Sequence, residues 1–85
     1  MRYEIIFDED AIDFLEKLTK QEKERIFNRI LCAKENPFHF FERLKGVPCF
    51  KLRAGDYRVI ADIKENEKII YILCIGHRKN VYKRI

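Results

Sequence analysis

Three basic residues in the middle of the chain have a spacing that could bind phosphate. Lys51 and Arg53 are two positions apart, and Arg58 follows the turn-forming residues 54–56, Ala-Gly-Asp. Because strand side chains alternate between two faces, a hairpin at this turn would place all three cations on one face. Such a cluster repels itself and is better tolerated when an anion neutralises it. The pattern predicts an anion-binding face, with ordinary exterior alternation as the plainer alternative.

A second group of reactive side chains lies near the C-terminus. His77 and Arg78 follow an apolar run, and Tyr82 comes shortly after them, so an imidazole, a guanidinium and a phenol approach the end of the sheet. Residues 37–85 hold eleven Lys and Arg against five Asp and Glu, whereas residues 1–36 hold seven against nine. A basic half of this kind is typical of a phosphate-binding surface, and a solvated basic rim without a specific ligand is the alternative.

Composition excludes several other chemistries. The chain contains no Ser, so a serine nucleophile is impossible. Cys32, Cys49 and Cys74 form no CxxC motif and cannot all pair, so we expect reduced thiols and no zinc site. We expect Cys32 and Cys74 to be buried as small hydrophobic residues. No metal or other cofactor is expected.

Length limits the chain to one domain, residues 1–85. Independent domains rarely have fewer than about 50 residues, so a second core does not fit. No apolar run approaches the roughly 20 residues of a membrane span, and the first residues lack the layout of a signal peptide. We therefore expect a soluble, cytoplasmic protein with no membrane partner.

Hydrophobic periodicity predicts the elements that position these side chains. Alternation indicates a strand at residues 3–7, and apolar spacing of three and four indicates a helix over residues 9–18. A capping box from Thr19 to Glu22 begins a second helix, which Pro37 ends. Its core-facing stripe would be Ile26, Phe27, Ile30, Leu31 and Ala33 or Lys34.

The rest of the chain predicts a sheet. The phenylalanine-rich segment 38–48 is expected to be a connecting loop or a short turn of helix, with its Phe side chains in the core or covered by a partner. Strands are expected at residues 49–53, 57–63 and 69–75, and their short connections allow only antiparallel hairpins. The predicted fold class is α+β: an N-terminal strand, an α-helical hairpin on one sheet face, and a three-stranded antiparallel meander.

Two motifs resemble a known family. They are KLRAGDYRVI at residues 51–60 and IGHRKNVY at residues 75–82. With the length and the order of elements, they are similar to the RelE/ParE superfamily of toxins from type II toxin–antitoxin systems, closest to RelE-type mRNA interferases. The resemblance implies a RelE-like, microbial-ribonuclease-like fold. It also implies a metal-independent endoribonuclease that cuts mRNA in the ribosomal A site by 2′-hydroxyl attack and so inhibits translation.

The resemblance also implies partners and catalytic residues. A cognate RelB-like antitoxin would neutralise the toxin, and operator DNA would be bound only through the toxin–antitoxin complex. The ribosome, with its rRNA, and mRNA would be the other partners. The functional residues of RelE-like toxins correspond to Lys51, Arg58, Arg78 and Tyr82.

Chemistry suggests a role for each of these groups. The guanidinium forks of Arg53 and Arg58 suit phosphate oxygens. Lys51 would be the general base if burial and neighbouring cations favour its neutral amine. Arg78 would stabilise the leaving oxygen, and Tyr82 would stack on an unpaired base.

His77 and three lysines complete the candidate set. An imidazole titrates near neutrality, so His77 is the better acid or base if its ring faces the site, and a hydrogen-bonded histidine at a strand end is the alternative. Lys45, Lys79 and Lys83 are further candidates for RNA-phosphate binding.

Two departures from the family pattern leave other functions open. Cys49 stands where well-studied RelE-type toxins have a second lysine, and the tail between Arg78 and Tyr82 is shorter, so the acid and base identities are not assigned. A ParE-like inhibitor of DNA gyrase would have the same fold. A homologue without catalysis, which binds only antitoxin and operator DNA, is the third possibility.

Overall fold

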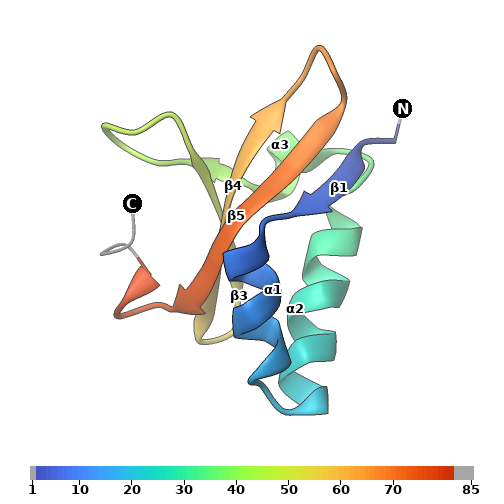
Figure 1. The fold of residues 1–85 in the computed structure, drawn as a ribbon. Helices are drawn as coiled ribbons and strands as arrows, with labels where there is room; N and C mark the ends of the chain where they lie inside the picture. The colour runs from blue at the N-terminus through green and yellow to red at the C-terminus, as the bar shows by residue number, and fades with distance from the viewer. Residues whose placement is uncertain (1, 82–85) are drawn as a thin grey trace.

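A five-stranded sheet carries two helices on one of its faces (Figure 1). The computed structural model describes residues 2–81. The strands are β1 (Glu4–Phe7), β2 (Glu42–Arg43), β3 (Phe50–Ala54), β4 (Tyr57–Lys64) and β5 (Ile69–His77). The helices are α1 (Glu9–Glu16), α2 (Lys20–Cys32) and the short α3 (Pro37–Phe40). The predicted α+β class is confirmed.

The strand order is β1-β5-β4-β3-β2. The antiparallel meander of β3, β4 and β5 is confirmed, and β1 pairs with β5 in parallel at the far edge. The short strand β2 was not expected. It pairs with the first two residues of β3, Phe50 and Lys51, and within residues 2–81 the rest of that edge has no neighbouring strand.

The two main helices begin at the predicted caps. The Asp8 carboxylate accepts a hydrogen bond from the amide of Asp10 at 3.1 Å. In the capping box, Thr19 Oγ1 accepts from the Glu22 amide and Glu22 Oε1 accepts from the Thr19 amide, each at 3.2 Å. Within residues 2–81, no helix is both long and apolar enough to cross a membrane.

Helix α2 ends at Cys32, four residues before the predicted end at Asn36. The amides of Ala33 and Lys34 bond to carbonyls three residues back, which tightens the last turn. The Lys34 carbonyl then accepts from the Tyr3 amide at 2.9 Å. This bond draws the segment after α2 toward the start of the first strand, so the helix does not continue to the proline.

The main core lies between the sheet and the helices. Ile26 and Ile30 of α2 are buried there against Leu52, Val59 and Ile72 of the three central strands. Because these strand residues face the helices, their sequence neighbours face the opposite side of the sheet.

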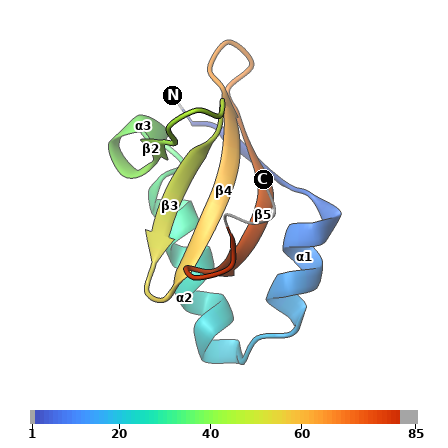
Figure 2. The ribbon, with the colours of Figure 1, turned by 90° about the vertical axis from the view of Figure 1, so that its left-hand side faces the viewer.

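A smaller cluster covers part of that opposite face. Ile60, Cys74 and Val81 are buried in it, and Figure 2 shows the segment after β5 passing in front of β4. A Cβ atom on Gly76 would lie 3.1 Å from the Cβ of Val81, so the returning segment needs a glycine at this point of close approach.

Three side chains predicted to be buried are exposed. Phe27 is 43% exposed, Leu31 is 46% exposed, and Cys32 is also exposed, whereas Cys74 is buried as predicted. Helix α2 buries Ile26 and Ile30 against the sheet, and its C-cap residue Ala33 is buried with them. The Phe27 ring instead stacks on Phe7 at 5.7 Å, so the buried stripe is narrower than the apolar stripe of the sequence.

The phenylalanine-rich segment divides between core and surface. Phe41 is buried, Phe40 packs against the core while partly exposed, and Phe38 is 44% exposed. The ring of Phe38 meets that of Phe50 edge-on at 5.6 Å. The segment contains the short helix that was one of its two predicted forms.

Candidate functional site

Lys51, Arg53 and Arg58 lie on the sheet face that the helices leave uncovered. Arg53 is directly opposite Arg58 across the β3–β4 pair, and Lys51 is opposite Ile60, which belongs to the smaller cluster on this face. The predicted alternation therefore brings the three cations together on two neighbouring strands.

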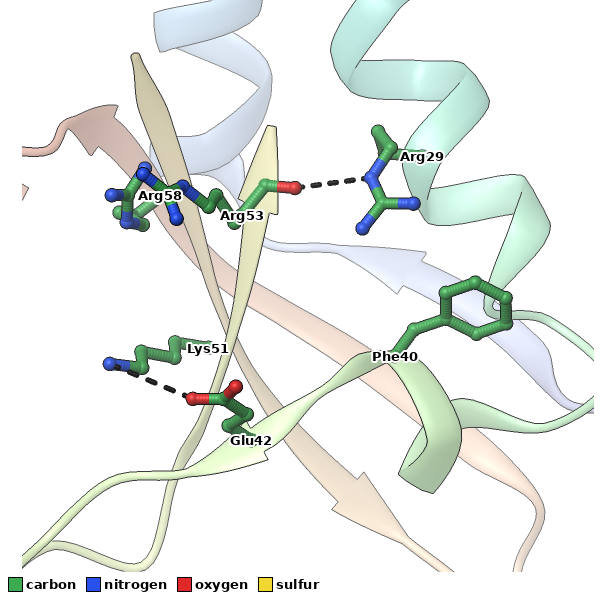
Figure 3. Close-up of a pocket in the computed structure, with 6 residues that line it drawn as sticks. All are labelled: Arg29, Phe40, Glu42, Lys51, Arg53 and Arg58. Carbon is green, nitrogen blue, oxygen red and sulfur yellow. Dashed lines mark hydrogen bonds and ion pairs between the residues drawn. The ribbon is translucent and has the colours of Figure 1, made fainter. Parts of the chain in front are cut away.

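These cations line a pocket at the free edge of β3 (Figure 3). Its volume is about 310 Å³. The lining residues are Arg29, Phe40, Glu42, Lys51, Arg53 and Arg58. Four cationic side chains and one carboxylate thus surround one open space, which suits a ligand with more than one negative charge.

The Arg58 guanidinium is held by the tight turn that precedes it. Its Nη1 donates to the carbonyls of Gly55 at 3.1 Å and Tyr57 at 3.0 Å. Gly55 adopts φ +62°, a conformation that glycine allows easily. Hydrogen bonds to the main chain restrict the arginine, so its charge is positioned before any ligand arrives.

Among the described residues, Glu42 is the one acidic side chain that lines the pocket. Its carboxylate lies 3.9 Å from Nζ of Lys51, and the two side chains are 77% and 36% exposed. An exposed pair at this separation contributes between 0 and about 1 kcal/mol. A phosphate could therefore replace Glu42 as the partner of Lys51 at little cost.

Arg29 was not identified from the sequence. It comes from α2, and its Nε donates to the carbonyl of Arg53 at 3.1 Å (Figure 3). Its guanidinium also lies 5.6 Å from the centre of the Phe40 ring. The only sequence signal was a basic residue in the last turn of a helix, because its position depends on how α2 packs beside β3.

The backbone of Arg78 lies beside the turn between β3 and β4, which also holds Arg58. The Arg78 amide donates to the Asp56 carbonyl at 2.8 Å, and the side chain of Arg78 is exposed. The segment after β5 is therefore anchored to the turn that also binds the Arg58 guanidinium.

His77 lies on the other face of the sheet. It is paired with Tyr57 in the β4–β5 register, and the two rings meet edge-on at 6.0 Å. Tyr57 itself contacts Phe14 of α1 and packs against the main core. Nδ1 of His77 accepts from the Lys79 amide at 3.3 Å. This arrangement matches the alternative of a hydrogen-bonded histidine at a strand end.

Tyr57 also links the sheet to the cap of α2. Its hydroxyl donates to Glu22 Oε2 at 2.7 Å. This hydrogen bond is the main cause that lowers the pKa of Glu22, and the hydrogen bonds from Thr19 lower it further. The same bond raises the pKa of Tyr57 above its usual value. The contact fixes the start of β4 relative to the turn between α1 and α2.

The other predicted residues lie apart from the pocket or beyond the described chain. Lys45 is exposed in the connection between β2 and β3, and Lys79 is exposed in the turn after β5. Tyr82 and Lys83 lie outside residues 2–81. In that described range, no group of three or more His, Cys, Asp or Glu residues could hold a metal ion.

Comparison with known proteins gives one family match. The model of the ParE toxin of type II toxin–antitoxin systems matches residues 5–82. The chain is 29% identical to a putative RelE-like toxin protein and 27% identical to the mRNA interferase toxin RelE of strain K12, both from Escherichia coli. Each alignment covers 93% of this chain and 86% of the relative.

Solved structures have the same fold. The RelE–RelB complex of the archaeon Pyrococcus horikoshii gives a TM-score of 0.77 at 26% identity, covering 92% of this chain and 97% of that one. The isolated Escherichia coli RelE toxin gives 0.74 at 26% identity, covering 96% and 93%. The RelBE2 toxin–antitoxin complex of Mycobacterium tuberculosis gives 0.81 at 22% identity, covering 92% and 100%.

Proposed function

Because the chain belongs to the ParE toxin family of type II toxin–antitoxin systems, we propose that it is an endoribonuclease that cleaves mRNA in the ribosomal A site. It is a RelE-like toxin, homologous to mRNA interferase RelE at 27% identity. The observation that carries the finer proposal is the pocket in which Lys51, Arg53 and Arg58 converge. Such a cluster can bind the phosphates of an extended RNA strand.

The cleavage would use the neighbouring 2′-hydroxyl as the nucleophile. This hydroxyl loses its proton, its oxygen forms a bond to phosphorus, and the bond from phosphorus to the 5′-oxygen breaks. Arg53 and Arg58 would stabilise the charge that develops on the phosphate oxygens. Lys51 would take the hydroxyl proton, and Arg78 would stabilise the leaving 5′-oxygen, which would take a proton from water. The phosphate would remain as a 2′,3′-cyclic ester. His77 has no part in this scheme because its ring lies with Tyr57 on the opposite face.

Weak acid and base groups explain why a ribosome would be required. Lysine and arginine are poor proton carriers near neutral pH, so most of the rate must come from alignment of the hydroxyl, the phosphate and the leaving oxygen. Positioning of reacting groups can contribute roughly 7 to 11 kcal/mol. The ribosomal A site would supply the alignment, and Tyr82 would stack on a base of the codon.

The direct experiment uses purified protein and ribosomes programmed with a defined mRNA. Mapping of mRNA 5′ ends is expected to show cuts within the A-site codon and no cuts in free mRNA. The control is the Arg58→Ala variant, whose fold is checked by circular dichroism. Intact message with the wild-type protein, beside normal cleavage by an authentic RelE toxin, would rule out the proposal.

Inhibition of DNA gyrase is the second candidate, because the matching family model describes ParE toxins. A gyrase inhibitor would block ATP-dependent supercoiling of relaxed plasmid and leave ribosome-bound mRNA intact. A non-catalytic homologue would do neither and would still bind its antitoxin. Running the supercoiling and mRNA assays on one preparation separates the three functions.

The partner in the cell would be a RelB-like antitoxin. The Pyrococcus horikoshii relative was solved as a RelE–RelB complex. An acidic segment laid over the pocket would neutralise its cations and exclude RNA, and operator DNA would be bound only through the complex. A short acidic helical protein encoded beside this chain should co-purify with it and suppress cleavage in the cytoplasm.

A further inference from the structure

We propose that Arg29 binds a second phosphate of the RNA strand, where the strand crosses the free edge of β3 beside the proposed cleavage site. The identity of the ligand as RNA rests on the proposed function. The location rests on the pocket, to which helix α2 contributes the cation Arg29. A single strand that entered this pocket from the uncovered sheet face would meet Arg29 at its edge.

The guanidinium of Arg29 is held in place by two contacts. Its Nε donates to the Arg53 carbonyl, where strand β2 no longer covers the edge of β3, and its Cζ lies 5.6 Å from the centre of the Phe40 ring. The hydrogen bond uses one of the five N–H donors of the group. The terminal nitrogens Nη1 and Nη2 have no hydrogen bond or ion pair to any of residues 2–81. They present a planar fork that can bind two phosphate oxygens.

A purely structural role would not require this charge. A lysine or glutamine could also donate to the Arg53 carbonyl, whereas a guanidinium adds a fourth positive charge to a pocket that already contains three. That arrangement is unfavourable without an anion. The main-chain bond ties Arg29 to the backbone of Arg53, whereas the Arg53 side chain extends from β3 toward Arg58 (Figure 3), so the two guanidinium groups line the pocket from either side of this strand.

The experiment measures binding of single-stranded RNA that cannot be cleaved. A fluorescent 2′-O-methyl oligonucleotide is titrated with wild-type protein and with Arg29→Gln over a range of salt concentrations. Removing one phosphate contact on a single strand should reduce the slope of log affinity against log salt by about 0.7. Affinity at low salt should fall by about tenfold, as expected for loss of a charged hydrogen bond. Arg29→Lys should restore the slope.

Arg43→Gln is the matched control. Arg43 also lies over a phenylalanine ring, 6.0 Å from the centre of Phe50, but does not line the pocket. Its replacement should leave the slope within error of the wild-type value. If Arg29→Gln does not fold, the wild-type protein is titrated by NMR instead. The Arg29 Nε–H signal should then shift with RNA, and the Arg43 signal should not.

The outcomes separate this inference from the proposed function. The inference is overturned if the slope of log affinity against log salt is unchanged in Arg29→Gln, or if the Arg29 NMR signal does not shift when RNA is added. This holds even if mRNA cleavage on ribosomes is normal. Loss of antitoxin binding with an unchanged RNA slope also overturns it, because Arg29 would then serve the protein partner. A reduced slope in a protein that cuts no mRNA supports the inference and removes the proposed activity.

Discussion

Arg53 and Arg58 face each other directly across the β3–β4 hairpin, and within residues 2–81 no carboxylate is paired with either of them in the sheet. Arg58 is held by two carbonyls of the turn, whereas the side chain of Arg53 is exposed. Like charges directly opposite in a sheet destabilise it. The hairpin therefore holds two arginines that repel each other, and a phosphate bound between them would attract both.

Arg53→Gln should make the protein more stable and less able to bind RNA. Removal of the opposed charge should raise the free energy of unfolding by about 0.2 to 1 kcal/mol at low salt. The gain should shrink at about 1 M salt, where the Debye length is about 3 Å. Urea unfolding followed by circular dichroism measures the stability, and anisotropy of the 2′-O-methyl RNA measures binding. A loss of stability at low salt would contradict the repulsion.

Glu42→Gln should strengthen RNA binding. The change removes the carboxylate that lines the pocket and frees Lys51 from its ion pair. Interactions between exposed charges reach about 1 kcal/mol, so affinity should rise by about twofold to fivefold at low salt. Glu67→Gln is the matched control because Glu67 is exposed in the turn between β4 and β5. An equal gain in both variants would indicate a general effect of net charge.

His77→Gln tests the two interpretations of that residue. Because its ring lies against Tyr57, His77 should contribute to packing alone. The rate of mRNA cleavage on ribosomes should therefore stay within about threefold of the wild-type rate. Loss of a general acid or base would instead lower the rate by about 10²- to 10⁴-fold. Mapping of mRNA ends over a time course gives the rate. A large loss of cleavage rate in a folded variant would indicate that the His77 imidazole acts in catalysis.

The sequence was sufficient for features that depend on local periodicity. Alternation in β3 and β4 placed Lys51, Arg53 and Arg58 on one face, and the capping box at Thr19 marked the start of α2. These predictions succeed because the side-chain period of a strand and the chemistry of a helix cap are set by neighbouring residues.

Features that depend on packing between distant segments were not predicted. Arg29 reaches the Arg53 carbonyl only because α2 lies beside an edge that β2 leaves open, and neither fact appears in a local pattern. Phe27 and Leu31 are exposed for a related reason, since the contact between α2 and the sheet is narrower than the apolar stripe. Tertiary context decides such positions.

The hydrogen bonds of Glu22 predict a dependence of stability on pH. The folded state lowers the pKa of Glu22, chiefly through the hydrogen bond from Tyr57. The contribution of the Glu22 carboxylate to the free energy of unfolding is therefore complete above the ordinary carboxyl pKa of about 4.3. It is lost as the pH falls through the lowered pKa of the folded state. Glu22→Gln should have a lower free energy of unfolding than wild type at pH 7, and this difference should become smaller as the pH falls below about 4.3 toward 3.

Urea unfolding at a series of pH values measures this difference. Glu24→Gln serves as the control because Glu24 is exposed on the same helix. Tyr57→Phe should return the pKa of Glu22, followed by NMR of its carboxyl carbon, toward the usual value. If wild type and Glu22→Gln differ in free energy of unfolding by the same amount at pH 7 and at pH 3, the carboxylate charge is not the cause of the difference.

Gly76→Ala should displace the segment that carries Arg78. The added Cβ would lie 3.1 Å from the Cβ of Val81, and Gly76 is directly opposite Arg58 in the sheet. Overpacking of this kind costs about 1 to 3 kcal/mol, so the free energy of unfolding should fall and cleavage should fall with it. Val81→Ala in the same chain removes the Cγ2 atom that would lie 3.3 Å from the new Cβ, so it should recover part of the stability and of the cleavage. The coupling in a double-mutant cycle should be about 0.5 to 3 kcal/mol. If the two substitutions were additive, the close contact between Gly76 and Val81 would not be what positions the segment.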